Sequence, residues 1–392
     1  MIDEFPFPNG PRGRVSAHFA HRREHDPLGP ARLPSGDVAR IATRYADVVA
    51  ILNDPRFSSD PSREGAPRMQ PGLNPTPGPG FLVLMDPPDH TRLRRLLTGT
   101  FTSRQIAAWR PRVRERAVEV LDARPDRFDF VKDVAFVYPA MVLCDVLGIP
   151  AVDFDRIRTW MGTMLSTSGF GLEQQVATFQ EFLAYLAELV IARQDSPGDG
   201  LLATMIEARD NGDKLTADEL VGIMFTLVTA GHEATGVVLS RSLLWLLDPR
   251  ERFEALRARP ESVPATVDEL LRLESPQHQG ALIRVATEDV PLPSGLIRKG
   301  EGVVAAVTSA NHDPEAFPNP TEMILNRRTQ HVTFARGIHH CLGANLARLE
   351  LQVMLEVLIE RHPNLDLAVP ADDVPWNGNH MFEQVTSLPL HK

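Results

Sequence analysis

One segment of the chain constrains its fold more than any other: LTADELVGIMFTLVTAGHEATGVVLSRSLLWLL, which ends at Leu247. Thr216 and Glu219 form the two ends of a capping box, which marks the start of a helix. Apolar residues then continue for about 32 positions, so the helix spans roughly 48 Å. Because the segment is apolar on almost every side, this helix must be buried. It therefore predicts a large, helix-rich core around one long central helix.

The rest of the chain supports a helix-rich protein with small sheets. The 392 residues are 43% hydrophobic and 23% charged, which is a globular composition. Short strands are predicted within 281–290 and 302–310, and a second long helix is predicted to begin at Cys341. No alternating βαβ pattern appears. We therefore expect a mainly α (α+β) fold in a single domain over residues 1–392.

Charge, cysteine content and hydropathy indicate the compartment in which the protein works and the partners that it does not bind. The formal net charge of −10 argues against nonspecific nucleic-acid binding. No window carries the roughly 18 consecutive apolar residues of a membrane span. The N-terminal MIDEFPFPNG lacks the basic and apolar regions of a signal peptide. With only two cysteines, the chain fits a reducing compartment, so we expect a cytoplasmic protein that binds neither nucleic acid nor membrane.

The segment FARGIHHCLG places Cys341 after two histidines, with a glycine on either side. The other cysteine, Cys144, lies in an apolar helical run and is predicted to pack in the core. A thiolate at a helix start is stabilised by the partial positive charge there, and it needs either a reaction or a metal. A zinc site and a cysteine nucleophile are alternatives, but paired ligands and a local imidazole signature are missing. A lone thiolate is enough to ligate haem iron.

This segment resembles the haem-binding loop of the cytochromes P450, Phe-Gly-x-Gly-x-His-x-Cys-x-Gly. The matching residues are Phe334, Gly337, His339, Cys341 and Gly343. Ala335 replaces the first glycine, which is tolerable if that residue keeps an ordinary backbone conformation. The resemblance implies that Cys341 is the metal ligand of a haem b and that the other matching residues bind this cofactor.

Two further segments resemble the same family in the right order. ELLR provides Glu269 and Arg272, the Glu-x-x-Arg of the family, and residues three apart on a helix can form an ion pair. The resemblance implies that this pair locks the following loop, with Arg327 as third partner. NHDPEAFPNP, which ends at Pro320, resembles the meander region before the cysteine loop.

Three basic residues are assigned to the haem carboxylates by the resemblance. In DPPDHTRLRR, His90 and Arg94 lie four residues apart and would both face the carboxylates. Arg284 lies among apolar neighbours in ALIRVA, where a buried charge is costly unless it is paired. The alternative for Arg284 is the exposed face of an edge strand.

The segment AGHEAT places Gly231 and Glu233 in the middle of the long apolar helix. The resemblance implies that the helix opens here over the iron, where dioxygen binds, and that Glu233 is the catalytic acid. Ala234 takes the place of the usual threonine, whose hydroxyl holds the water that relays protons. Thr235 follows one position later, about 100° around the helix, and points elsewhere. We favour proton delivery assisted by the substrate or by ordered water, with oxidation lacking oxygen insertion as the alternative.

The resemblance implies a haem-thiolate monooxygenase of the soluble bacterial type. Such an enzyme inserts one oxygen atom from O2 into a lipophilic small molecule by hydroxylation or epoxidation. Its substrate is expected to be a secondary metabolite such as a polyketide, macrolide or terpenoid. The alternatives are oxidative C–C or C–O coupling, peroxide-driven oxidation by the same haem, and a noncatalytic haem sensor.

The remaining expectations concern the source of electrons and the residues of the substrate pocket. No segment resembles a fused flavin or iron–sulfur domain, so a separate ferredoxin and ferredoxin reductase are expected. Residues 92–116 contain eight arginines and one acid, either a docking face for an acidic ferredoxin or ordinary solvated helix faces. By resemblance, the apolar substrate pocket includes Leu82, Phe170, Phe225, Ala230, Leu282 and Met381.

Overall fold

The computed structural model describes most of the chain. The described residues are 2–69, 78–164, 171–196, 198, 200–210, 213–276, 282–377 and 384–392. The chain divides into two compact units, each assembled from separate segments. The first unit comprises Met1–Gly78, Val83–Thr91 and Glu269–Cys341, and the second comprises Pro79–Leu82, Arg92–Asp268 and Leu342–Lys392. A single domain over residues 1–392 stays a prediction.

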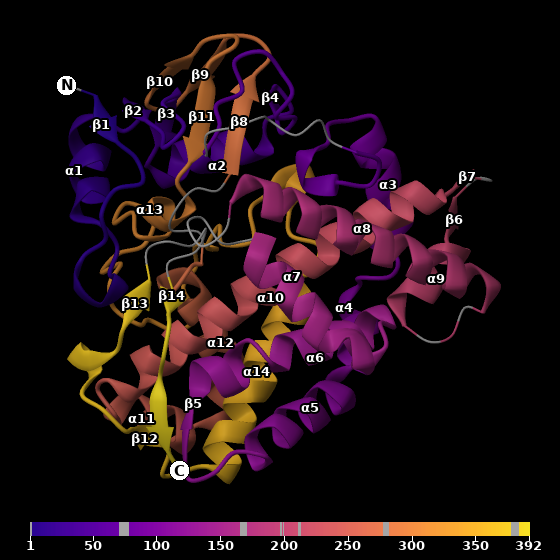
Figure 1. Cartoon of the computed structure of the whole chain (residues 1–392). Coiled ribbons are helices and arrows are strands. Elements are labelled where there is room, and N and C mark those ends of the chain that lie inside the picture. Colours follow the sequence, from indigo (N-terminus) through magenta and orange to yellow (C-terminus); the bar gives the residue numbers. More distant parts are fainter. Residues whose placement is uncertain are drawn as a thin grey trace. The chain divides into compact units, whose positions relative to one another are not determined.

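The first unit is built on a six-stranded sheet (Figure 1). The strand order is β1 (Asp3–Glu4), β2 (Pro30–Arg32), β3 (Val38–Ala42), β11 (Gly302–Ala305), β8 (Leu282–Ala286) and β4 (Phe57–Ser58). β11 is parallel to β3 and antiparallel to β8, with Val303 opposite Arg284. A separate ribbon joins β9 (Val290–Leu292) to β10 (Gly295–Ile297). β8 therefore lies inside the large sheet, between β11 and β4.

Short helices accompany this sheet. They are α1 (Ala17–His25), α2 (Tyr45–Asn53) and α13 (Val307–Asn311), with the 3-10 turns η1 (Pro11–Gly13) and η6 (Gly337–His339). α2 packs against β11 and α13, and its side chains Val48 and Ile51 are buried there. The segment 302–310, predicted as one strand, forms β11 and then α13. The helical part is fixed by packing on α2 and by a hydrogen bond from the Ser309 hydroxyl to the Thr43 carbonyl.

The second unit is mostly helical. Its helices are α4 (Ser103–Ala108), α5 (Arg110–Asp122), α6 (Tyr138–Leu147), α7 (Phe154–Met164), α8 (Leu172–Asp195), α9 (Leu201–Glu207), α10 (Ala217–Leu247), α11 (Glu251–Ala258) and α14 (Ala344–Arg361). The division between the units falls within α3 (Asp89–Thr98), within α12 (Val263–Leu273) and within the turn η2 (Leu82–Leu84). Further single turns are the π-helix η3 (Val131–Ala135), η4 (Ala151–Asp153), η5 (Pro260–Ser262) and η7 (Ala371–Asp373).

α10 is the central element of the second unit and confirms the predicted long helix. It runs unbroken from Ala217 to Leu247, and the capping box of Thr216 and Glu219 is present. It packs against α6, α8, α11 and α14. By length and hydropathy alone α10 could cross a membrane, but 61% of its apolar window is buried inside the protein. Burial of this kind is typical of the core helix of a soluble protein.

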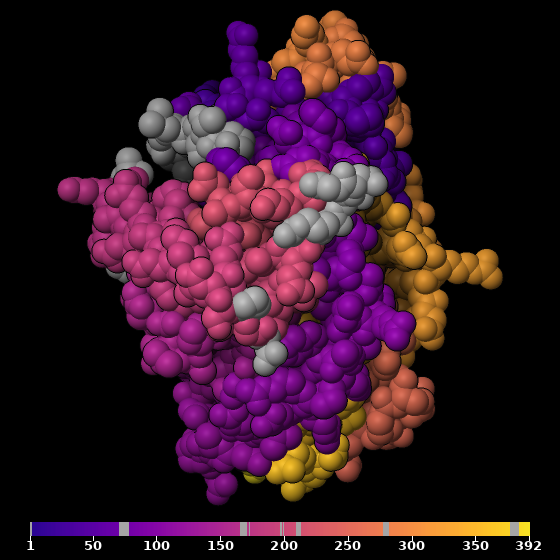
Figure 2. All heavy atoms as spheres, turned by 90° about the vertical axis from the view of Figure 1, so that its right-hand side faces the viewer, coloured from indigo at the N-terminus to yellow at the C-terminus, as the bar shows by residue number. Residues whose placement is uncertain are grey.

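Small sheets complete the second unit. β5 (Arg127–Asp129) and β12 (Asp366–Leu367) flank β15 (Pro389–His391). β6 (Arg209–Asp210) pairs with β7 (Asp213–Lys214), and β13 (Trp376–Asn377) pairs with β14 (Gln384–Val385). α8 packs against both α7 and α9, and Figure 2 shows these helices in magenta and pink as one face of the second unit. The mainly α (α+β) fold class is thereby confirmed.

Candidate haem site

The cysteine singled out by the sequence lies in a loop between η6 and α14. The N–H of Cys341 donates a hydrogen bond to the carbonyl of Phe334 at 2.8 Å, which closes the loop, and its side chain is exposed. The prediction that Cys341 opens a helix is wrong. α14 begins at Ala344, because Gly343 keeps non-helical backbone angles and caps the helix. The thiol therefore lies on a tight loop that precedes the first turn of α14.

Two residues of this loop have left-handed backbone angles. Gly337 has a φ of +66°, and a β-carbon there would lie 2.4 Å from the carbonyl oxygen of Leu52. Ala335 has a φ of +55° although it carries a side chain. The condition under which alanine would be readily tolerated here, an ordinary backbone conformation, is therefore not met. It retains the left-handed geometry that favours glycine, at a cost of roughly 1 kcal/mol.

The donor set at this loop suits haem better than a bare metal ion. Within the described ranges, no group of three His, Cys, Asp or Glu side chains is placed to hold a metal ion. Cys341 presents one exposed thiol on a loop whose backbone approaches Leu52 too closely for a side chain at Gly337. Haem iron needs only such a single thiolate, because the porphyrin supplies the equatorial ligands. The residues present therefore fit a haem.

Two histidines predicted to bind haem lie together in the first unit. The ring centroids of His90 and His339 are 4.3 Å apart. His90 is buried near the start of α3, where its N–H donates to the carbonyl of Asp86 at 3.1 Å. Nε2 of His339 is hydrogen bonded to Oγ of Ser59 at 2.9 Å. Contacts within the protein therefore place the two rings side by side.

Arg284 is a buried cation in β8, with 6% of its surface exposed. The alternative of an exposed position on an edge strand is wrong, because β8 has a neighbour on each side. Burial lowers the pKa of the guanidinium to about 10, and the nearby carboxylate of Asp86 partly offsets this effect. The group stays charged at neutral pH and is suited to binding an anion.

Arg94 and Gly343, also predicted to bind haem, lie in segments of the second unit. Arg94 is half-buried in α3, four residues after His90, so the two side chains leave the same side of that helix. At Gly343 an added β-carbon would meet no described atom within 4 Å. The protein itself therefore gives no steric reason for glycine at 343, and the roles of both residues stay predictions.

Glu269, Arg272 and Arg327 form a buried ionic cluster in the first unit. Arg272 donates two hydrogen bonds to the Glu269 carboxylate, at 2.9 and 2.7 Å, and Nε of Arg327 donates a third at 2.8 Å. Burial alone would raise the pKa of Glu269, but these hydrogen bonds lower it below its ordinary value. The ion pair expected from the spacing is present, with Arg327 as its third member.

The same cluster fixes the meander that precedes the cysteine loop. Arg272 and Arg327 donate to backbone carbonyls along this segment, those of Asn311, Pro318, Asn319, Pro320 and Glu322. A guanidinium satisfies several carbonyls at once because it carries five N–H donors in a fixed plane. The cluster therefore holds an irregular stretch of backbone that has no ladder of its own.

The segment AGHEAT lies in a continuous part of α10. The opening of the helix implied by the resemblance is not seen, and the Thr235 hydroxyl donates to the carbonyl of Gly231 at 3.2 Å. Ala230 is exposed, and Gly231 and Ala234 are half-buried, although most of their neighbours in α10 are buried. These three residues share one helix face. We call them the small-residue stripe, a feature that sequence reasoning did not identify.

The other polar residues of AGHEAT are buried. Besides its bond to the helix backbone, the Thr235 hydroxyl favours the charged form of the buried carboxyl group of Glu350 in α14 and opposes part of the rise in its pKa. Nε2 of His232 is hydrogen bonded to the carbonyl of Phe136 at 2.8 Å, and burial lowers the pKa of this imidazole. Glu233 is 6% exposed. The Thr235 hydroxyl is thus occupied by the helix backbone, and the catalytic role of Thr235 stays a prediction.

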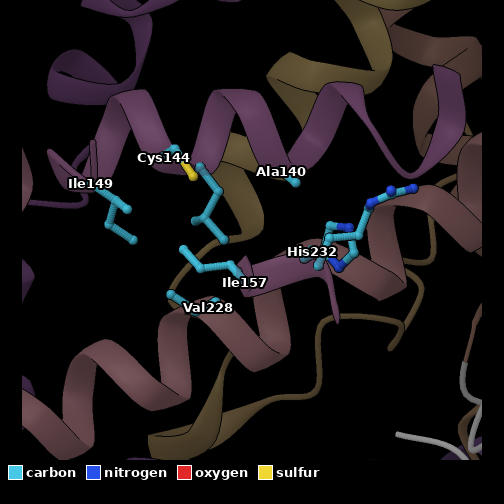
Figure 3. Close-up of a pocket in the computed structure, with 8 residues that line it drawn as sticks. Ala140, Cys144, Ile149, Ile157, Val228 and His232 are labelled. Atoms are coloured by element: carbon cyan, nitrogen blue, oxygen red, sulfur yellow. The ribbon is translucent and has the colours of Figure 1, made fainter. Parts of the chain in front are cut away.

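A small cavity lies beside His232 in the second unit (Figure 3). It is lined by Ala140, Leu143, Cys144, Ile149, Ile157, Arg158, Val228 and His232, from α6, α7, α10 and the chain next to them. Its volume of about 10 Å³ suits roughly one water molecule, so it is no substrate pocket. The buried thiol of Cys144 has its pKa raised by burial to about 12, which confirms the predicted core cysteine.

The predicted pocket residues fall partly outside the described chain. Phe170 and Met381 are not among the described residues. Leu82 is buried in η2, and Leu282 is half-buried at the start of β8. Ala230 belongs to the small-residue stripe. The role of all five residues in binding substrate stays a prediction.

Phe225, the remaining pocket candidate, belongs to an aromatic cluster in the second unit. Its ring centroid lies 5.1 Å from that of Phe81, 5.2 Å from Phe179 and 5.7 Å from Phe182. Three of these rings, including Phe225, are only half-buried. The cluster joins α10 to α8 and to the chain before η2, and it offers apolar surface to a ligand.

Among the described contacts, those of five arginines between 92 and 116 are ion pairs inside the second unit. Their partners are Asp213 and Glu219 for Arg92, Glu356 for Arg110, Asp145 for Arg112 and Arg116, and Glu360 for Arg114. These contacts favour the interpretation as solvated helix faces with local ion pairs for much of this segment.

Sequence reasoning missed Ser59 and Asp86, which contact the predicted haem residues. Asp86 belongs to DPPDHTRLRR, but only the histidine and arginine of that segment were singled out. Ser59 follows β4 in a segment without periodicity, so no sequence pattern identified it. Its contact with His339 arises only when distant segments fold together.

Comparison with known proteins places the chain among its relatives. The profile of the family Cytochrome P450 matches residues 164–380. Nocardicin C N-oxygenase of Nocardia uniformis subsp. tsuyamanensis is 39% identical, covering 99% of this chain and 98% of that protein. Mycinamicin IV hydroxylase/epoxidase of Micromonospora griseorubida is 36% identical, covering 98% of each. The crystal structure of the LnmA cytochrome P450 hydroxylase of Streptomyces atroolivaceus S-140 matches with a TM-score of 0.91 and 39% identity over all of both chains.

A helix-rich α+β fold with an exposed cysteine on a glycine-shaped loop fits the class of haem-thiolate proteins, in which one cysteine thiolate holds the haem iron. The chain belongs to the cytochrome P450 family. It is a monooxygenase, an oxidoreductase whose cofactor is haem, and its work requires dioxygen, a lipophilic substrate and redox partner proteins.

Proposed function

We propose that this monooxygenase holds its haem through Cys341 and hydroxylates or epoxidises a secondary metabolite, such as a polyketide, macrolide or terpenoid. The observation that carries the proposal is the exposed thiol of Cys341 on a loop closed by the Phe334 carbonyl. Relatives named as nocardicin C N-oxygenase and mycinamicin IV hydroxylase/epoxidase support a substrate from antibiotic biosynthesis. The absence of a charged group from the small-residue stripe suits a lipophilic ligand.

In this proposal each part of the chain has a separate task. Bound haem supplies the activation of dioxygen, and Cys341 donates electron density to its iron. The buried Arg284, with His90, Arg94 and His339, binds the haem carboxylates through charge-assisted hydrogen bonds.

Residues of α10 would serve the oxygen chemistry. The small-residue stripe leaves room for ligands because its side chains end at the β-carbon or lack one. Glu233 is the proposed acid, and its burial limits the water around it. With no hydroxyl at 234, the water that carries protons must be held by the substrate or by other ordered waters.

The aromatic cluster around Phe225 is the proposed apolar wall of the substrate site. Phe225 is half-buried and packs against Phe81 and Phe179, which are half-buried as well. Leu82, Phe170, Ala230, Leu282 and Met381 are proposed to complete it. Added substrate should change the spin state of the ferric haem, which provides a direct measure of binding.

Electrons are proposed to come from a separate ferredoxin and its reductase in the cytoplasm. The arginines of 92–116 would provide part of the docking face, although five of them already bind acids of this chain. Arg104 in α4 is exposed. Raising the salt concentration should slow reduction by an acidic ferredoxin if charge steers the encounter.

A carbon monoxide difference spectrum tests the haem ligand. The reduced wild-type protein should show the far-red-shifted Soret band of thiolate ligation, and Cys341→Ala should lose this band. Cys144→Ala is the matched control, because Cys144 is buried in α6 and its thiol has a raised pKa of about 12. An unchanged band in Cys341→Ala would refute the proposal.

Ala234 favours one second candidate, oxidative C–C or C–O coupling or a peroxide-driven reaction by the same haem. These reactions place smaller demands on proton delivery than oxygen insertion does. Product analysis separates the candidates: a product that has gained an oxygen atom from ¹⁸O2 supports monooxygenation. A dimeric product, or turnover with hydrogen peroxide alone, supports the second candidate. A noncatalytic sensor would show neither.

A further inference from the structure

We propose that Asp86 and Ser59 are positioning residues for the haem carboxylates. The Asp86 carboxylate provides a permanent negative charge near the Arg284 guanidinium, and Ser59 orients the His339 ring. The inference rests on the proposed binding of haem through Cys341. It adds two residues to the contacts that the family resemblance implies.

The Asp86 carboxylate joins two elements of the first unit. It accepts hydrogen bonds from the Ser58 hydroxyl, from the Ser59 N–H at 2.9 Å and from Nε of Arg63 at 3.3 Å. Its backbone carbonyl accepts the N–H of His90 at 3.1 Å. One residue therefore ties the end of β4 to the part of α3 that carries His90.

The same residue faces the charge of Arg284. Ser58 pairs with Val285, the neighbour of Arg284 in β8, so the Asp86 cluster borders this strand. The guanidinium is 6% exposed, and the Asp86 carboxylate stabilises its charged form. A haem carboxylate that binds Arg284 therefore shares this cation with Asp86. Since reduction adds an electron to the haem, a fixed negative charge nearby disfavours the reduced state.

Ser59 acts through position rather than charge. Its backbone N–H is held by Asp86, and its hydroxyl is hydrogen bonded to Nε2 of His339 at 2.9 Å. The His339 ring lies 4.3 Å from that of His90. Ser59 therefore sets the direction of one ring, and Asp86 holds the backbone that carries the other. Arrangement before binding lowers the cost of ordering a site around its ligand.

The charge role is tested with Asp86→Asn in the full-length, haem-loaded protein. Asparagine keeps an acceptor for the Ser59 N–H but removes the charge. The haem reduction potential should shift to a more positive value, while the thiolate carbon monoxide band stays unchanged. Asp54→Asn is the matched control: the Asp54 side chain is 20% exposed against 19% for Asp86, and it pairs with Arg56. An unshifted potential in Asp86→Asn, or an equal shift in Asp54→Asn, would overturn the inference.

The positioning role is tested by the rate of haem transfer to excess apomyoglobin. Ser59→Ala should lose haem about tenfold faster, as expected for the loss of one hydrogen bond in a partly buried site. Its reduction potential should match that of the wild type. Ser59→Thr keeps the hydroxyl and should retain haem like the wild type, with circular dichroism confirming the fold of both variants.

The outcomes separate this inference from the proposed function. If the wild-type protein lacks the thiolate band, the proposed haem ligand is wrong. If that band is present but Ser59→Ala loses haem at the wild-type rate, only the role of Ser59 is refuted. Equal losses in Ser59→Ala and Ser59→Thr would also refute it, because the hydroxyl would then be irrelevant.

Discussion

The hydroxyl of Thr235 on α10 interacts with the buried carboxyl group of Glu350 on α14, inside the second unit, and favours the charged form of that carboxyl. Glu350 is only 2% exposed, and its Oε2 has no hydrogen-bond partner among the described residues. Burial raises the pKa of this carboxyl well above its ordinary value of 4.5. The folded protein therefore keeps a proton on Glu350 under conditions in which the unfolded chain releases it.

Replacing Glu350 by Gln should stabilise the protein increasingly as the pH rises. Between the pKa values of the unfolded and folded states, unfolding releases one proton from Glu350. Its contribution to the free energy of unfolding therefore falls by about 1.4 kcal/mol per pH unit in that window. Glutamine cannot ionise, so Glu350→Gln loses this dependence. Melting temperatures of both proteins should diverge as the pH rises above the ordinary carboxyl pKa of 4.5.

Glu356→Gln provides the control for this measurement. Glu356 lies on the same helix, but it pairs with Arg110 at 2.6 Å near the surface. The melting temperature of Glu356→Gln, plotted against pH, should run parallel to that of the wild type. Parallel curves for Glu350→Gln as well would show that Glu350 is ionised in the folded protein.

Removing Glu269 should strongly destabilise the first unit. Glu269→Ala leaves Arg272 and Arg327 buried without their shared carboxylate, and breaking a buried pair in this way costs about 3–5 kcal/mol. Glu254→Ala is the control, because the Glu254–Arg257 pair is similarly spaced but exposed, and its loss should cost less than about 1 kcal/mol. Chemical denaturation measures both. Equal losses would mean that the buried cluster has no special role in stability.

Restoring glycine at position 335 should stabilise the cysteine loop. Ala335 has a φ of +55°, where an L-residue is strained, so Ala335→Gly should raise the free energy of unfolding by about 0.5–1 kcal/mol. Ala347→Gly, in the regular helix α14, should lower it by about 1 kcal/mol. The two substitutions are thus expected to change the free energy of unfolding in opposite directions. A destabilised Ala335→Gly would mean that the methyl group contributes more through packing than its backbone strain costs.

Features with a repeating pattern were predictable from the sequence, and single backbone angles were not. The length and start of α10 follow from apolar residues and a capping box, and the Glu269–Arg272 pair follows from helical spacing. The angle at Ala335 leaves no periodic signal, and neither does the turn that delays α14 until Ala344. Propensity alone favours an alanine in an ordinary conformation, so the loop geometry overrides it.

Contacts between distant segments were beyond the sequence for a different reason. Ser59 meets His339, and Thr235 meets Glu350, only after separate elements have packed. Neither Ser59 nor Glu350 stands out locally, because a serine after a strand and a glutamate in a helix are ordinary. The small-residue stripe could not be recognised from the sequence either. Its residues are apolar like the rest of α10, and only their exposure in the fold distinguishes them.

The final prediction concerns the hydroxyl missing from Ala234. Ala234 is a half-buried member of the small-residue stripe, so a larger side chain there would change the surface that this stripe exposes. The hydroxyls of Thr229 and Thr235 in the same helix already bond to backbone carbonyls four residues earlier. A hydroxyl introduced by Ala234→Thr should be drawn to the same kind of acceptor. With proton delivery assisted by substrate or ordered water, it should change product formed per electron pair by less than about twofold.

Ala234→Val is the matched control for that variant, because valine has the shape of threonine without its hydroxyl. Product, consumed reductant and released hydrogen peroxide are measured for both variants with a substrate that changes the spin state. Equal small losses in both would reflect crowding of the small-residue stripe. A large rise in coupled product with Ala234→Thr alone would mean that the natural enzyme lacks a proton relay rather than using another one, which contradicts the proposed assistance by substrate or water.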